Sequence, residues 1–217
     1  MAFFQRERND PIVIHREWPM KPEPNYFLAL WPDSALSRVI HERIPSWTEA
    51  MGGRVRTTTH AGDLHLTLVF LGALSHEERK QAVSVARELA GPGFTLRLDR
   101  LGVFPRSRTL WVAPSRVPRA LTGLVGRLQD GLERARLPVP GRSPFVPHLT
   151  IARLTQPSSR ESRGIEAIDW PVHDFCLACS RPGPPYRIME RWALAPAGKD
   201  PVRTEGPVDA GGSREPA

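Results

Sequence analysis

Two short segments of this sequence carry the same residue types in the same order, and those types could perform acid–base chemistry. One segment begins at His65 and the other at His148, and in both the histidine is followed by leucine, threonine and an aliphatic residue. Near neutral pH, a neutral imidazole can take a proton from water and a protonated imidazole can give one to a leaving oxygen. A pair of such groups suits the cleavage of a phosphodiester bond.

The threonine of each segment is placed to help its histidine. Side chains on a β-strand alternate between two faces, so a histidine shares its face with the residue two positions later. Thr67 therefore accompanies His65, and Thr150 accompanies His148, while the aliphatic residues face the core. Two such strands related by a pseudo-two-fold axis would aim both pairs into one cleft. We predict that His65 and His148 are catalytic and that the two threonine hydroxyls bind the substrate phosphate.

An arginine follows the second segment at an odd offset. Arg153 is five residues past His148, and strict alternation would place it on the opposite face of the strand. It reaches the cleft only if the strand twists or ends there. A guanidinium in the cleft would stabilise the extra negative charge of a pentacovalent phosphorus. On that condition we predict Arg153 as a phosphate-binding residue.

Other interpretations of these residues compete with catalysis. A single histidine on a strand is more often structural, but two matching copies favour chemistry. A zinc site built from His65 and His148 lacks a third histidine or a clustered carboxylate, so no metal is expected. Asp63 could orient His65 or cap a turn, and we prefer the turn. His60 precedes the first segment in a polar run and is interpreted as a loop residue.

The elements that would position these residues alternate between strands and helices. Short apolar runs ended by proline or glycine predict strands at residues 26–31, 64–71, 94–101, 109–113, 148–154, 172–180 and 186–194. Helices are expected to begin at Asp33 or Ser34, at a capping box from Ser75, and at Arg119, with a short polar helix near residues 158–164. Strands that form hairpin-like pairs between helices indicate an α+β fold with antiparallel pairing.

The two cysteines, Cys176 and Cys179, have the spacing of a redox pair or of half a zinc site. They fall within a predicted strand, where residues three apart point to opposite faces. We therefore expect two reduced structural cysteines rather than a disulfide or a metal site.

Composition sets wider limits. The 217 residues carry a formal charge of +7, which is almost entirely arginine. This charge fits either a compositional bias or a phosphate-binding surface. No apolar run is long enough to span a membrane, and the first residues do not resemble a secretion signal, so we expect a cytoplasmic protein. Charge and proline at both ends predict a flexible extension over residues 1–24 and a disordered tail over 197–217, around one domain at 25–196.

The motifs and their flanks resemble the RNA 2′,3′-cyclic phosphodiesterases, or 2′-5′ RNA ligases, of the two-histidine phosphoesterase superfamily. The resemblance is carried by the run from His65 to Gly72, which ends in Phe-Leu-Gly, and by the run from Phe145 to Arg153. It implies a bilobal α+β fold in which two antiparallel sheets, with helices outside, face a central cleft. Where the family often has asparagine, this chain has Asp63.

The resemblance also implies an activity. It implies that the enzyme opens 2′,3′-cyclic phosphate ends of RNA or oligonucleotides to 2′-phosphomonoesters, as a monomer, without metal or cofactor. His65 would protonate the departing O3′ and His148 would activate water. ATP-independent 2′-5′ joining would be the reverse reaction. Two alternatives stay open: a phosphodiesterase for small cyclic nucleotides or tRNA-derived ends, and a non-catalytic RNA-binding module on the same fold.

Overall fold

The computed structural model describes residues 24–52, 54–89, 91–137, 145–156, 162–180 and 185–196. The predicted N-terminal extension, apart from residue 24, and the predicted C-terminal tail lie outside these residues. The strands are β1 Asn25–Leu30, β2 Val55–Thr58, β3 Leu66–Ala73, β4 Phe94–Phe104, β5 Thr109–Pro114, β6 Leu149–Leu154, β7 Arg163–Val172, β8 Asp174–Ser180 and β9 Arg187–Ala193. The helices are α1 Ser34–Ala50, α2 His76–Glu88 and α3 Arg119–Arg134, with a 3-10 turn, η1, at Ala61–Asp63.

The three long helices begin where local chemistry predicts. The Asp33 carboxylate caps α1 by accepting the backbone N–H of Leu36 at 2.8 Å. Ser75 and Glu78 form both hydrogen bonds of a capping box at the start of α2. On α3, buried aliphatic residues recur every three or four positions, which gives the helix one apolar side to pack against the protein.

The strands form one antiparallel path in the order β7-β4-β5-β6-β3-β1-β8-β9, with β2 also paired to β6. At its middle, β3 and β6 are joined by a single register pair, Leu66 with Leu149. The unit β1-α1-β3 on one side of this pair has the same order of elements as β5-α3-β6 on the other. The predicted α+β class with antiparallel pairing is confirmed, and the two halves of the expected pseudo-two-fold arrangement meet at this pair.

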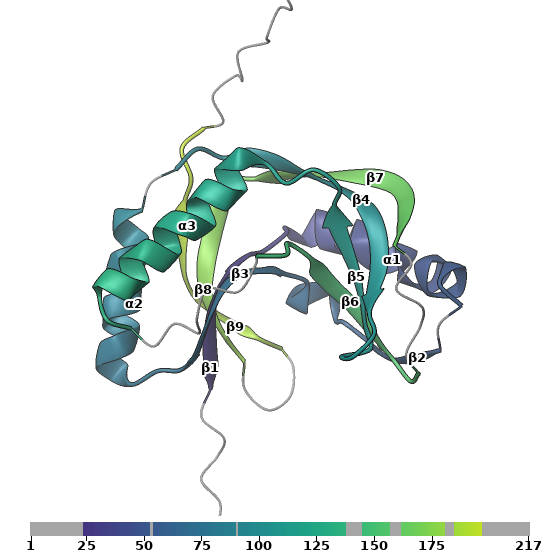
Figure 1. Ribbon diagram of the computed structural model, residues 1–217, viewed down its shortest axis with the longest axis horizontal. Coiled ribbons are helices and arrows are strands. Elements are labelled where there is room, and N and C mark those ends of the chain that lie inside the picture. Colours follow the sequence, from purple (N-terminus) through teal and green to yellow (C-terminus); the bar gives the residue numbers. More distant parts are fainter. Residues whose placement is uncertain are drawn as a thin grey trace, which may run out of the picture.

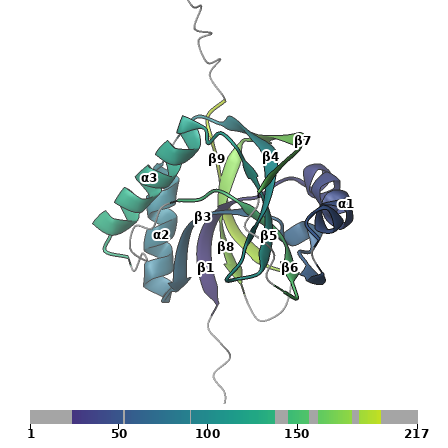
Figure 2. The same cartoon turned by 45° about the vertical axis from the view of Figure 1, so that its right-hand side comes forward.

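The helices lie on the outside of the strands, as expected. Figures 1 and 2 show α2 and α3 together on one flank and α1 on the opposite flank. Each long connecting helix packs on the central strand of the other half, since α3 contacts β3 and α1 contacts β6. The helices therefore fix the two central strands, and with them the segments that carry the histidines.

Two elements were not predicted. Strand β7 begins at Arg163, where we expected the end of a short polar helix. That prediction is wrong for residues 163 and 164, whereas residues 157–161 lie outside the described part of the chain. Strand β2 is exposed along its whole length, so no apolar alternation marks it in the sequence.

The two cysteines lie on opposite faces of β8, as their spacing predicts. Cys179 belongs to the main core, while Cys176 belongs to a small separate cluster with Phe27, Ala29 and Trp31. Both are free and buried, and burial raises the pKa of the Cys176 thiol to about 12. This small cluster covers the face of the sheet that carries His65.

Candidate active site

Both predicted catalytic histidines lie immediately before the first residue of a central strand. His65 precedes β3 and His148 precedes β6, rather than lying within the strands as we predicted. The leucine after each histidine is fully buried, and these two leucines form the pair that joins the halves. The histidines and the threonines two positions later are half-buried on the other face. The structure therefore brings both motifs together at the middle of the sheet.

The same backbone contact fixes both imidazole rings. Nδ1 of His65 lies 2.7 Å from the carbonyl oxygen of Asp63, and Nδ1 of His148 lies 2.8 Å from that of Val146. A carbonyl oxygen can only accept a hydrogen bond, so Nδ1 carries the hydrogen in both rings. In the neutral form of each ring, the free lone pair is then on Nε2. Both rings are thus prepared to exchange a proton through Nε2.

Burial lowers the pKa of both histidines, but their neighbours differ. For His65, the bond to the Asp63 carbonyl and the charge of the Asp63 carboxylate oppose this lowering, while the charge on His148 adds to it. For His148, the bond to the Val146 carbonyl opposes the lowering and the charge of Arg153 adds to it. His65 therefore has a carboxylate that favours its protonated form, and His148 has a cation that favours its neutral form.

Three aromatic rings surround His65. Trp31 stacks on it with ring centroids 5.1 Å apart, Phe27 lies at 4.9 Å, and Tyr186 meets it edge-on at 5.4 Å. Sequence reasoning missed this group, because the three residues come from β1, from its end and from the segment before β9. The run of aromatic and aliphatic residues at 26–31 was the available signal, but it reads equally well as a buried strand.

The carboxylate of Asp63 has a second role besides its charge. Asp63 is buried, and its Oδ1 accepts the backbone N–H of Tyr186 at 2.8 Å. It is also the last residue of η1, so our preferred interpretation as a turn residue is confirmed. One residue thus ends the turn, binds Nδ1 of His65 through its carbonyl oxygen and holds Tyr186 against the ring.

Arg153 lies on the cleft face because β6 contains a β-bulge. Thr150 is paired with Trp111 and Ala152 with Leu110, so Ile151 is an extra residue on β6. A bulge shifts the alternation by one position, and Arg153 consequently faces the same side as Thr150. The guanidinium donates to Oγ1 of Thr109 and, at 3.2 Å, to the carbonyl oxygen of Ser107. The expectation from strict alternation is thereby corrected.

Two hollows meet at the histidine pair. The first, about 590 Å³, is lined by His65, Thr67, Thr150 and Arg153, and also by His60 and Tyr186. The second, about 380 Å³, is lined by His148. His148 and Thr150 are two positions apart on one face, about 6.6 Å along a strand, so the hollows adjoin.

The chemistry of the first hollow is that of a phosphate site. It combines an imidazole, hydroxyl groups and a guanidinium. Among the residues that the structure describes, no three His, Cys, Asp or Glu side chains are grouped as metal ligands would be. No described helix is long and apolar enough to cross a membrane.

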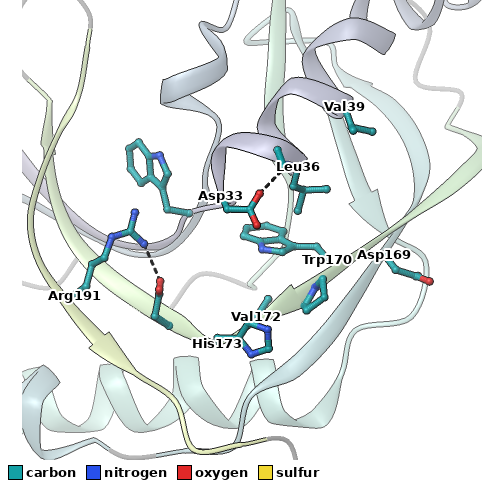
Figure 3. Close-up of a pocket in the computed structure, with 12 residues that line it drawn as sticks. Asp33, Leu36, Val39, Asp169, Trp170, Val172, His173 and Arg191 are labelled. Carbon is teal, nitrogen blue, oxygen red and sulfur yellow. Dashed lines mark hydrogen bonds and ion pairs between the residues drawn. The ribbon is translucent and has the colours of Figure 1, made fainter.

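A third hollow, of about 550 Å³, lies away from the histidine pair (Figure 3). It is bounded by the start of α1, the β7–β8 turn and β9. Asp33, Asp169 and Asp174 line it with a single arginine, Arg191, which is paired to Asp174 at 2.9 Å. Because carboxylates outnumber cations there, this hollow repels rather than binds a phosphate. None of the predicted site residues lines it.

Comparisons with known proteins agree with this architecture. Residues 40–179 match the 2′-5′ RNA ligase superfamily. An Escherichia coli protein named RNA 2′,3′-cyclic phosphodiesterase is 32% identical over 179 residues, covering 80% of this chain and 98% of that protein. A Thermus thermophilus protein of the same name is 33% identical over 142 residues, 60% of this chain and 72% of the relative.

The fold is also similar to solved structures. The apo structure of E. coli LigT has a TM-score of 0.64 and 31% identity, covering 80% of this chain and 99% of LigT. The complex of LigT with 3′-AMP has a TM-score of 0.63, 30% identity and the same coverage.

Proposed function

This chain belongs to the 2′-5′ RNA ligase superfamily, and from that premise we propose that it hydrolyses RNA 2′,3′-cyclic phosphate ends to 2′-phosphomonoesters. The observation that carries the proposal is the convergence of two identically oriented imidazoles, each with a threonine beside it, at one pair of central strands. Two relatives that are named RNA 2′,3′-cyclic phosphodiesterases support the choice of substrate.

In the proposed reaction His148 acts as the base and His65 as the acid. Nε2 of His148 takes a proton from water as the water oxygen attacks phosphorus. The bond from phosphorus to O3′ breaks, and His65 gives its proton to O3′. The products are a 2′-phosphomonoester and a free 3′-hydroxyl. Asp63 beside His65 and Arg153 beside His148 support this assignment of roles, because they bias the two rings toward opposite protonation states.

The remaining predicted residues bind the reacting phosphate. Thr67 and Thr150 donate from their hydroxyls to non-bridging oxygens. Arg153 uses part of its guanidinium to bind Thr109 and Ser107, and its other N–H groups stabilise the charge that builds up on phosphorus. Because its anchors lie on the β4–β5 turn, the guanidinium is held in place before substrate arrives, which reduces the cost of ordering it.

We also propose that the protein acts as a monomer and works in the cytoplasm. Every group assigned to the reaction comes from one chain, which supports the monomer. Two buried free thiols suit a reducing compartment. The proposal includes ATP-independent 2′-5′ joining only as the reverse of the same step.

The decisive experiment uses a short RNA that ends in a 2′,3′-cyclic phosphate, followed by product analysis. We expect a 2′-phosphate product and no requirement for ATP. A 3′-phosphate product would contradict the assignment of O3′ as the leaving oxygen. Binding of the RNA without hydrolysis would favour the non-catalytic RNA-binding module instead.

A further inference from the structure

The hollow beside His148 differs in chemistry from the one beside His65. Its walls are aromatic and aliphatic, because Trp111 and Phe145 are half-buried there and Val146 and Val117 are exposed by 54% and 39%. Charged and hydroxyl groups are few, whereas threonines, histidines and Arg153 dominate the other hollow. The site thus has one polar side, rich in hydrogen-bonding groups, and one side that offers flat apolar surface.

A flat aromatic surface in this hollow depends on a glycine. The indole of Trp111 lies across Gly102, where a Cβ would come within 2.3 Å of the ring. Phe104 packs at 5.4 Å from Trp111 and edge-on to His148 at 4.9 Å. The aromatic wall is therefore continuous with the ring that we assign as the base. Bases of single-stranded RNA bind such surfaces by stacking.

The only cations that line this hollow, among the residues described, are Arg100 and a protonated His148, and no carboxylate lines it. Arg100 is exposed on β4, and its guanidinium donates to the hydroxyl of Ser162. Asp99, its neighbour on β4, accepts two hydrogen bonds from Ser115, at 2.6 and 2.7 Å. Its carboxylate is thereby occupied, and the charge of Arg100 stays available to an anion.

We propose that the hollow beside His148 binds the RNA on the 5′ side of its terminal nucleoside, with a phosphate at Arg100 and a base against Trp111 and Phe145. This inference rests on the proposed function and narrows its substrate to oligonucleotide ends rather than cyclic mononucleotides. A cyclic mononucleotide has no 5′ chain, so it leaves this hollow empty. The same charge argument excludes the carboxylate-rich hollow of Figure 3 as a place for RNA.

The test compares kcat/KM for an RNA trinucleotide that ends in a 2′,3′-cyclic phosphate with that for the cyclic mononucleotide of the same terminal base. For the unmodified protein we expect the trinucleotide to be preferred by roughly tenfold or more. Arg100→Gln should lower kcat/KM for the trinucleotide roughly tenfold and leave the mononucleotide unchanged. Its plot of log kcat/KM against log salt should be less steep by about 0.7 for the trinucleotide alone.

A matched control removes the same charge from the same strand. Arg97 is exposed on β4 and paired with Asp169, and it does not line this hollow. Arg97→Gln should therefore leave both substrates unaffected. Equal kcat/KM for the two substrates in the unmodified protein, or an equal loss on both in Arg100→Gln, would overturn the subsite while leaving the proposed function intact. Hydrolysis of neither substrate would instead remove the proposed function, and the subsite with it.

Discussion

The two copies of the histidine motif are alike at their start and diverge further along the strand. Each copy begins with an imidazole held by the carbonyl oxygen two residues before it, and each has a β-bulge after its threonine. Leu68 is the extra residue on β3, as Ile151 is on β6. The position beyond the bulge is Phe70 in one copy and Arg153 in the other. The repeated backbone thus presents the same proton chemistry twice but a guanidinium only once.

This difference assigns separate tasks to the two halves of the molecule. The half that contains β6 provides the charge for the phosphate and the cation that lowers the pKa of His148. The half that contains β3 provides an aromatic enclosure and a carboxylate for His65. Two equal imidazoles would compete for one proton, whereas unequal surroundings allow one to hold it and the other to lack it.

The largest expected effect is the loss of either imidazole. His65→Ala and His148→Ala should each lower kcat by roughly 10²- to 10⁴-fold, because each removes one proton transfer. The circular dichroism spectrum should not change, and His76→Ala, at an exposed position on α2, should keep full activity. Substantial activity in either site variant would show that the two copies are not catalytic partners.

The next effect tests the residue that only one copy has. Arg153→Gln should lower kcat roughly a hundredfold, as removal of one group that stabilises the transition state does. It should also allow the pKa of His148 to rise, so that the acid limb of the pH–rate profile moves to higher pH. Phe70→Leu, at the equivalent position of the other copy, should leave both limbs in place. A shift of the acid limb in Phe70→Leu would refute the division of tasks.

A smaller effect is expected from the carboxylate that only His65 has. Both histidine pKa values are lowered from 6.5, so the profile of kcat/KM should be bell-shaped with its maximum below that pH. Asp63→Asn keeps an oxygen for the N–H of Tyr186 but removes the charge, so the pKa of His65 should fall further. If His65 is the acid, the alkaline limb moves to lower pH; movement of the acid limb would instead make His65 the base.

No change is expected when metal is removed. Hydrolysis in the presence of EDTA should match that in its absence, because both proton transfers are assigned to imidazoles. Loss of activity that zinc restores would overturn the assignment for both copies together.

The repetition of histidine and threonine was sufficient to predict most of the site. Period-two alternation placed His65 with Thr67 and His148 with Thr150, since these pairs precede the bulges. The same rule failed for Arg153, because an extra residue on one strand changes the face of everything after it, and the register of the partner strand is not visible in the sequence. The aromatic enclosure of His65 was missed for a similar reason, because Tyr186 reaches it through tertiary packing and a hydrogen bond to Asp63.

The predictions for the fold show the same limit. Helices with capping residues and an apolar side were predicted well, because their signals are local. Strand β2 is held by its pairing to β6 and not by burial, and β7 has exposed residues along much of its first half. Neither carries the alternation that marks a half-buried strand, so both could be recognised only once their partners were known.

The single leucine pair at the middle of the sheet has a consequence for how the protein would be inactivated. Leu66 and Leu149 alone connect the two ladders directly, and each is the immediate neighbour of a catalytic ring. Mild heat or denaturant that separates this seam would move the two rings apart while each four-stranded half kept its own pairing. We expect turnover to be lost before the circular dichroism signal falls, so that activity reports the integrity of this seam earlier than any measure of secondary structure.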